Sequence, residues 1–274
     1  MLKKLTTKML FLLIIANISI ATTNRELYNL NNKNEKNIYR KYDAISGNTE
    51  IISNNLTNDL IVSSSLFYEN EMDKILNLID DKKEIKKINK AYGNSQNVII
   101  SIMNLNKSLF PKKLLGYEYV NQNKSTLATV VMEAHLFSFN TYFEYSNNKE
   151  SFIDNSDFIY EYLYFKGTSM TEEELKKLNS QEIEKELAKK YTELDKQVES
   201  LEFKNEKDKK EYIKNYRKSI DELKSDMNNF NNSYSELIEE STYENDIKDK
   251  LLIFPKYQMI MNLTFFITEL KEGL

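Results

Sequence analysis

Apolar residues recur at alternating steps of four and three along two stretches in the C-terminal half of the chain, within 187–201 and 213–237. This spacing keeps one side of a helix apolar and is the period of a coiled-coil seam. The phase of the pattern slips by one residue between the two stretches, inside the charged segment 204–210. We therefore predict two helices that fold back near Lys207 as an antiparallel coiled-coil hairpin at 171–247.

The reversal predicts which apolar residues of the two arms face each other. The predicted pairs are Leu201–Ile213, Val198–Tyr216, Leu194–Ile220, Tyr191–Leu223 and Leu187–Met227. The same register sets Asp195 beside Arg217 and Lys190 beside Asp226. Exposed ion pairs contribute about 0.2–1 kcal/mol each, so these charges would select the orientation of the arms more than they would stabilise it.

The start of the first arm carries a signal of its own, because Thr171 is followed three residues later by Glu174 and the two can form a capping box. One alternative to the hairpin stays open. No Gly or Pro lies between Thr168 and Phe254, so the two stretches could form one continuous helix that pairs with a second chain. Self-association through the coiled coil is the consequence of that alternative.

Helical periodicity also covers two segments in the first half of the chain. The first runs over 58–89, and Gly93 is the expected stop. The second runs over 98–109, beginning after Ser95 as a candidate cap and ending at Pro111. Because this second segment opens with three β-branched residues, a short strand is the alternative there.

Three further segments complete the pattern. Residues 125–145 are apolar over a broad face, which is typical of a central helix in a bundle. Residues 158–165 are crowded with aromatic side chains and fit a short helix or a strand. Pro255 is expected to kink or restart a final helix. The inner face of that helix should hold Ile260, Leu263, Ile267 and Leu270.

The N-terminus has the features of a secretory signal peptide over residues 1–21: three lysines, an apolar run, and a small-residue cleavage site. The apolar run is shorter than the ~20 residues that a membrane span needs, so we expect cleavage, with an uncleaved anchor as the alternative. We expect a secreted, periplasmic or cell-envelope protein. Residues 22–57 are polar and predict a flexible leader or a weak helix, followed by a helical domain over 58–274.

Composition favours an all-α helical bundle. The 274 residues include only 5 Gly and 2 Pro, whereas sandwiches, barrels and open α/β folds use these residues at many turns. The absence of Cys excludes a disulfide framework, so the core alone must hold the fold. A formal net charge of −4 gives no electrostatic reason to expect nucleic acid as a partner.

The candidate chemistry is sparse. The single histidine, His135, follows Glu133 by two residues, and a helix places residues at that spacing on different faces, so they do not form a metal pair. We expect His135 to be packed inside its helix. The carboxylate pairs 172–173 and 239–240 lie in charged runs that indicate a solvated surface. We expect no catalytic residue, cofactor site, cofactor or metal site, although spacing does not test a site built from distant carboxylates.

These features together predict a non-enzymatic interaction protein, an adhesin-like virulence factor or a host- or envelope-binding protein, that binds an unidentified protein partner. The 18 Tyr and 14 Phe suggest aromatic contacts along exposed helix faces. The alternative is a helical membrane-active, pore-forming toxin that inserts 125–145 and 251–270. We expect no stable membrane span in the mature chain, because polar residues and Pro255 interrupt 251–270. A metal-independent hydrolase is a third, less favoured class.

Overall fold

The computed structural model describes residues 24–43, 49–111, 117–147, 179–203, 205–241 and 243–273, and within these ranges it contains seven helices and no strand. The predicted all-α class is confirmed. The expected signal segment 1–21, the aromatic segment 158–165 and Thr171 lie outside the described residues. The helices are α2 (Asn24–Asp43), α3 (Thr49–Asn77), α4 (Lys82–Leu109), α6 (Tyr117–Asn147), α9 (Ser180–Glu199), α10 (Glu206–Glu239) and α11 (Asn245–Gly273).

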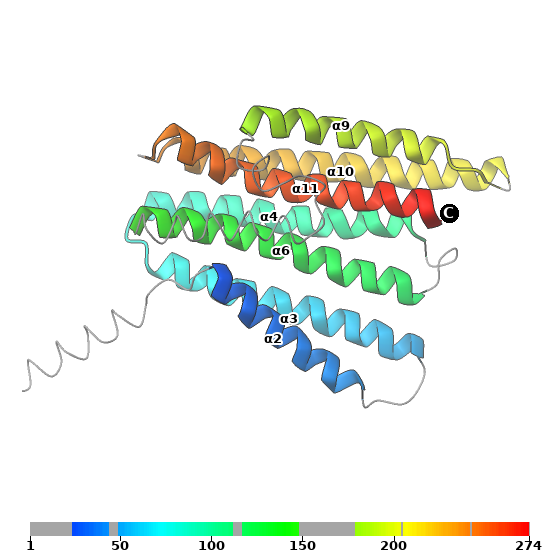
Figure 1. Ribbon diagram of the computed structural model, residues 1–274, viewed down its shortest axis with the longest axis horizontal. Helices are drawn as coiled ribbons and strands as arrows, with labels where there is room; N and C mark the ends of the chain where they lie inside the picture. Colours follow the sequence, from blue (N-terminus) through cyan, green and yellow to red (C-terminus); the bar gives the residue numbers. More distant parts are fainter. Residues whose placement is uncertain are drawn as a thin grey trace, which may run out of the picture.

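Apart from α2, which runs at an angle to α3, the helices lie side by side along one long axis, with α3, α6 and α10 running in one direction and α4, α9 and α11 in the other (Figure 1). A central group is formed by α4, α6, α10 and α11. Within it, α10 packs most broadly on α4, and α6 packs on both α4 and α11. On one outer side α3 and α2 cover α6, and on the other α9 covers α11.

The predicted reversal near Lys207 is present. α9 ends at Glu199 and α10 begins at Glu206, with Asn205 as the N-cap whose Oδ1 accepts a hydrogen bond from the Asp208 backbone N–H at 2.8 Å. The alternative of one continuous helix is therefore wrong. The coiled-coil seam itself stays a prediction: α9 packs most broadly on α11 and α10 on α4, and the two arms have little direct contact with each other.

The charge pairs predicted between the two arms are wrong. Asp195 accepts a hydrogen bond from the Tyr216 hydroxyl at 2.5 Å, while Arg217 pairs with Glu199 at 3.5 Å. Lys190 pairs with Glu193 of its own helix at 2.9 Å instead of reaching α10. The register was derived for an isolated hairpin. In the bundle, the apolar side of α10 packs on α4 and that of α9 packs on α11, so different polar residues of the two arms lie next to each other.

The predicted flexible leader at 22–57 is wrong for its described residues, and the helical alternative holds for 24–43. Leu27 and Asn31 of α2 are each only 1% exposed. The amide of Asn34 donates to the Ser63 hydroxyl of α3 at 2.6 Å, and Lys41 pairs with Asp59 at 2.7 Å. Polar side chains do much of the docking of α2, and apolar periodicity does not register them.

The helix boundaries predicted around Gly93 are also wrong. Gly93 lies inside α4, and the Ser95 hydroxyl donates to the Tyr92 carbonyl within the same helix instead of capping a new one. The strand alternative for the segment after Ser95 is also wrong, because this segment is part of α4. The chain breaks earlier, between α3 and α4, where Asp81 is the N-cap and its Oδ1 accepts from the Lys83 backbone N–H at 2.8 Å.

The burial predicted for the two most apolar helices is confirmed. Every side chain from Val131 to Phe143 in α6 is buried, as expected of a central helix. The expected restart of the helix at Pro255 is wrong, because Pro255 lies inside α11. The four residues predicted for the inner face of this helix are all buried: Ile260, Leu263, Ile267 and Leu270. α9 has a capping box formed by Asn179 and Glu182.

Candidate functional site

Aromatic side chains were expected on exposed helix faces, and the structure buries most of those that it describes, fully or in part. Among the aromatic side chains that it describes, Tyr39 is the exposed one, at 45%. Tyr234, for example, is 1% exposed and its hydroxyl donates to the Ser138 carbonyl at 2.9 Å. Tyr is an amphipathic residue that can be buried once its hydroxyl has a partner, so the described aromatic side chains mainly form the core.

The exposed apolar residues gather instead on α3. Ile51, Val62 and Leu66 are 58%, 56% and 54% exposed. Val62 and Leu66 are one helical turn apart, and Ile51 lies three turns before Val62 in a stripe on the same side of the helix, with the exposed Asn55 and Asn58 between them. The opposite side of α3, which carries Leu60 and Tyr68, is buried in the bundle.

Leu30 of α2 extends this stripe across the boundary between the two helices. The contact between Asn34 and Ser63 fixes the level of the antiparallel pair. Leu30 lies one turn before Asn34, and Leu66 lies close to one turn beyond Ser63, so both leucines are at the same level. Leu30 is 48% exposed. We call Leu30, Ile51, Val62 and Leu66 the α2–α3 apolar face.

Acidic residues continue the stripe toward the C-terminal end of α3. Glu69 and Asp73 are exposed and follow Leu66 at helical spacing on the same side. The α2–α3 apolar face is thus bordered at one end by two carboxylates. A complementary surface would carry apolar side chains with basic groups at one end.

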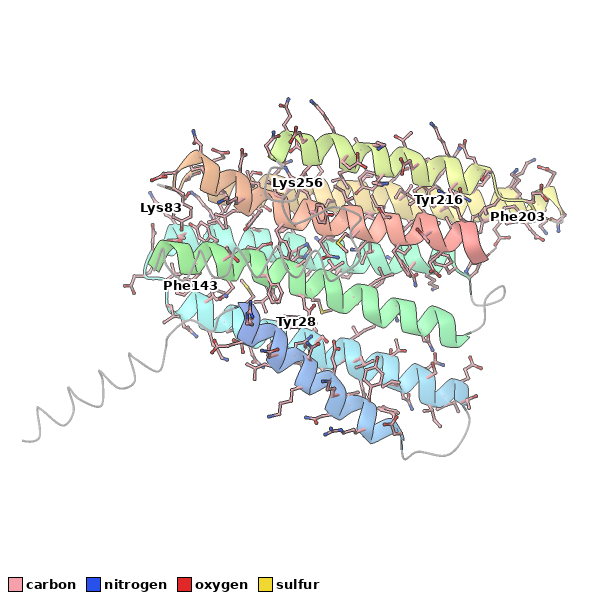
Figure 2. The ribbon with its side chains drawn as sticks, viewed as in Figure 1. Tyr28, Lys83, Phe143, Phe203, Tyr216 and Lys256 are labelled. Atoms are coloured by element: carbon pink, nitrogen blue, oxygen red, sulfur yellow. The ribbon has the colours of Figure 1, made fainter. Side chains whose placement is uncertain are left out.

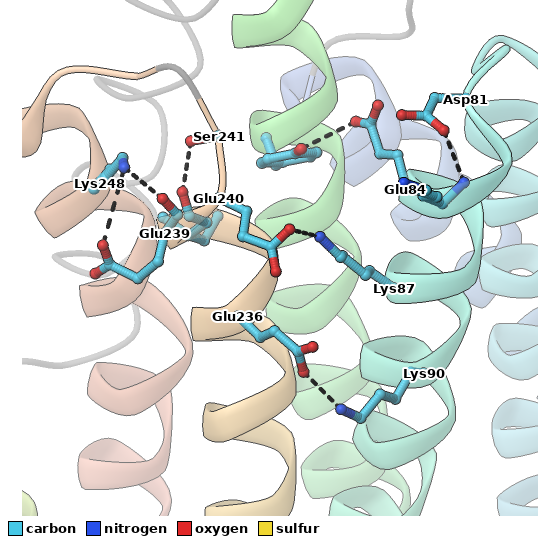
Figure 3. A network of polar contacts seen from close by, with 12 residues as sticks. Asp81, Glu84, Lys87, Lys90, Glu236, Glu239, Glu240, Ser241 and Lys248 are labelled. Atoms are coloured by element: carbon cyan, nitrogen blue, oxygen red, sulfur yellow. Dashed lines mark hydrogen bonds and ion pairs between the residues drawn. The ribbon is translucent and has the colours of Figure 1, made fainter.

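The carboxylate pair at 239–240 belongs to a network of ion pairs that joins helices at one end of the bundle (Figure 3). Glu240 pairs with Lys87 of α4, and Glu236 pairs with Lys90 at 2.6 Å. The hydrogen bond and the charge of Lys90 hold the pKa of the Glu236 carboxyl below its usual range. This network fastens α10 to α4, and the interpretation of these carboxylates as a solvated charged surface is supported. The other pair, 172–173, lies outside the described residues.

His135 and Glu133 point to different neighbours, as their spacing predicted. The His135 ring lies 4.4 Å, centroid to centroid, from the Phe230 ring of α10. Burial lowers the pKa of His135 to about 3, so the ring is neutral at pH 7. Glu133 accepts a hydrogen bond from the Asn31 amide of α2 at 2.9 Å. Among the described residues, no group of three or more His, Asp or Glu side chains could hold a metal ion.

Two further buried polar features were not predicted. Lys256 of α11 is 4% exposed and lies on the side of the helix toward α9 (Figure 2), where its ammonium group pairs with Glu184 at 2.5 Å. Asn106, Gln258 and Asn262 are buried amides. The sequence alone could have pointed to both features. The α2–α3 apolar face has apolar residues at polar positions of its helices, and the amides are polar residues at apolar positions of theirs.

No protein family, curated protein or solved structure matches this sequence. Among the described residues, one stretch of helix, Lys248–Lys271 of α11, is long and apolar enough to cross a membrane, with a mean hydropathy of 1.2. In the structure 78% of its apolar window is buried against other helices, as in the core helix of a bundle.

Proposed function

We propose that this chain is an exported, non-enzymatic interaction protein, adhesin-like or host- or envelope-binding, that binds a protein partner through the α2–α3 apolar face. The observation that carries the proposal is the alignment of Ile51, Val62 and Leu66, each more than half exposed, along one stripe of α3. Single exposed apolar residues are ordinary on a protein surface, but an aligned set is typical of a surface that a partner covers. Burial of such side chains contributes about 25 cal/mol per Å² of apolar area.

Two features support the absence of catalysis and the export. The one histidine is 4% exposed inside the bundle, where a substrate would not reach it as a general base. Residues 1–21 have the charge, apolar run and small-residue site of a cleavable signal peptide. The proposal is accordingly a secreted or envelope-associated binding protein.

The partner is proposed to be a protein whose surface offers an apolar strip with basic residues at one end. The apolar strip would cover Val62 and Leu66, and the basic residues would meet Glu69 and Asp73. Charges at the rim of an interface mainly raise the association rate and fix the orientation. Binding should therefore slow at high salt while much of the affinity persists.

Capture from host and envelope extracts tests the proposal with a matched pair of variants. Val62→Glu with Leu66→Glu places two charges on the α2–α3 apolar face. Ile100→Glu places a charge on α4 at an apolar residue that is equally exposed, at 53%. We expect wild type and Ile100→Glu to retain the same protein and the double variant to lose it, with circular dichroism confirming that all three are folded. Equal capture by all three would contradict the proposed surface.

A membrane-active toxin is the second candidate, and the apolar length of Lys248–Lys271 favours it. The alternative assigned insertion to 125–145 as well, yet among the described residues α11 alone meets the length and hydropathy of a span. A liposome-leakage assay separates the two candidates. The interaction proposal predicts no dye release from anionic or neutral vesicles, whereas concentration-dependent release would support the toxin.

A further inference from the structure

Three amide side chains lie buried inside the bundle with polar atoms that have no hydrogen-bond partner. Asn106 of α4 is 1% exposed, and Gln258 and Asn262 of α11 are 3% and 4% exposed. Neither the Nδ2 nor the Oδ1 of Asn106 has a partner, and the same holds for the Nδ2 of Asn262 and the Oε1 of Gln258. We call these three residues the buried amide layer.

Contacts at both ends of the helices place Asn106 and Asn262 at one level. α4 and α11 run in the same direction (Figure 1), and just beyond the end of α4 the Phe110 ring lies 6.0 Å from the Phe266 ring of α11. Four residues, or about one turn, before each phenylalanine stand Asn106 and Asn262. Gln258 is a further turn back and donates a long hydrogen bond, 3.5 Å, to the Oδ1 of Asn262.

The opposite end of the bundle gives the same alignment. The Tyr142 hydroxyl of α6 donates to Glu84 in the first turn of α4 at 3.0 Å, and its ring lies 5.5 Å from Tyr243, just before α11. α4 and α11 therefore begin at one level and keep it along their length. Asn106 and Asn262 are therefore at one level of the bundle.

The chemistry of the layer indicates its occupant. A buried amide without partners is costly, and native proteins pair such groups with other polar groups or with ordered water. The layer offers two amide NH₂ groups as donors, on Asn106 and Asn262, and two oxygen acceptors, on Asn106 and Gln258. A water molecule needs two to four such partners of both kinds, and no charged side chain in the layer would recruit an ion.

We propose that the buried amide layer is an internal water-binding site, in which water bridges Asn106 of α4 to Asn262 and Gln258 of α11. These helices lie diagonally across the central group and have little direct contact with each other. The water supplies a polar link between them. This site is independent of the α2–α3 apolar face and of any partner.

Water-selective NOE spectroscopy on the ¹⁵N-labelled full chain tests the site. We expect cross-peaks between the water signal and the side-chain amide protons of Asn106 and Asn262. Asn121 is the matched control, since it is also buried, at 4%, but its Nδ2 donates to Asn54 at 2.7 Å and Ser53 at 3.2 Å. The Asn121 amide should show no water cross-peak. Equal cross-peaks at all three, or none at Asn106, would overturn the proposal.

A variant tests whether the water is shared between the two helices. In Asn262→Leu we expect the Asn106 water cross-peak to weaken several-fold, because the water loses a partner on α11. An unchanged Asn106 cross-peak would overturn the bridge. If the ¹⁵N spectrum shows that Asn262→Leu is unfolded, Gln258→Met gives the same readout with a side chain of nearly the same shape, and the same result decides.

Discussion

At the scale of single residues, the structure shows that the one histidine and its neighbouring carboxylate lie in different surroundings. His135 is enclosed by apolar side chains next to Phe230, and its Nδ1 has no partner. Glu133 faces α2 and not His135. The separation of these two groups was predictable from their spacing in a helix, whereas the identity of their neighbours was not, because it depends on α2 and α10.

Burial of His135 makes the stability of the fold depend on pH. The pKa of His135 is about 3 in the folded chain, against 6.5 for an unperturbed imidazole. Between these values the unfolded chain binds a proton that the folded chain does not, so the contribution of His135 is complete above pH 6.5 and is lost as the pH falls toward 3. From pH 7 to pH 5 this amounts to about 2 kcal/mol.

His135→Leu should remove that contribution, since leucine has a similar volume and no proton to gain. Urea unfolding of both proteins at pH 7 and pH 5 gives the comparison. We expect wild type to lose about 2 kcal/mol more stability than the variant over this interval. Equal losses in the two proteins would show that carboxylates and not His135 account for the pH dependence.

Gly93 offers a second test at the residue scale. It lies inside α4, and a Cβ added there would meet no atom within 4 Å. Gly93→Ala should therefore raise the free energy of unfolding by about 0.5–1 kcal/mol, because alanine loses less backbone entropy in a helix. Ala188→Gly, at an exposed position of α9, is the reverse control and should lower it by about 1 kcal/mol. A destabilised Gly93→Ala would show that α4 is not continuous there.

At the scale of elements, the apolar pattern identified most helices but not their partners. The period of α9 and α10 predicted two helices and the reversal between them, and both are present. The same period does not predict which helix each apolar side packs against. In the structure α10 packs on α4 and α9 packs on α11. α2 was missed as a docked element because the contacts of Asn31 and Asn34 are polar and leave no periodic signal.

The ion pair between Lys256 and Glu184 holds α9 on α11 and can be tested by changing each partner. Glu184→Gln leaves the ammonium group of Lys256, which is 4% exposed, without its counter-charge. Removal of one partner of a fully buried pair costs about 3–5 kcal/mol, and because Glu184 is 61% exposed we expect about 1–2 kcal/mol here.

Lys256→Met removes the buried charge itself and should be close to neutral, since a flexible apolar side chain of similar length replaces it. Glu186→Gln, in an exposed pair with Lys189, should change stability by less than about 0.5 kcal/mol. Thermal unfolding of the three variants is the measurement. A Glu184→Gln effect as small as that of Glu186→Gln would show that Lys256 is solvated and that the ion pair does not hold α9.

At the scale of the whole molecule, the scarcity of Gly and Pro together with helical periodicity predicted the all-α class. The sequence did not predict the candidate surface. Val62 and Leu66 fall off the face that their helix buries, so they could have been noted as outliers in the pattern. Their alignment with Leu30 could not be predicted from the sequence, because it depends on how α2 lies along α3. A surface shared by two helices is a property of their packing.

Hydrogen–deuterium exchange of the full chain, free and with the captured partner, tests the central claim most directly. The account predicts that the partner adds protection in peptides from α2 and α3, which carry Leu30, Ile51, Val62 and Leu66, while α9 and α11 are unchanged. Added protection confined to α9–α11, with α2 and α3 exchanging as in the free protein, would contradict it.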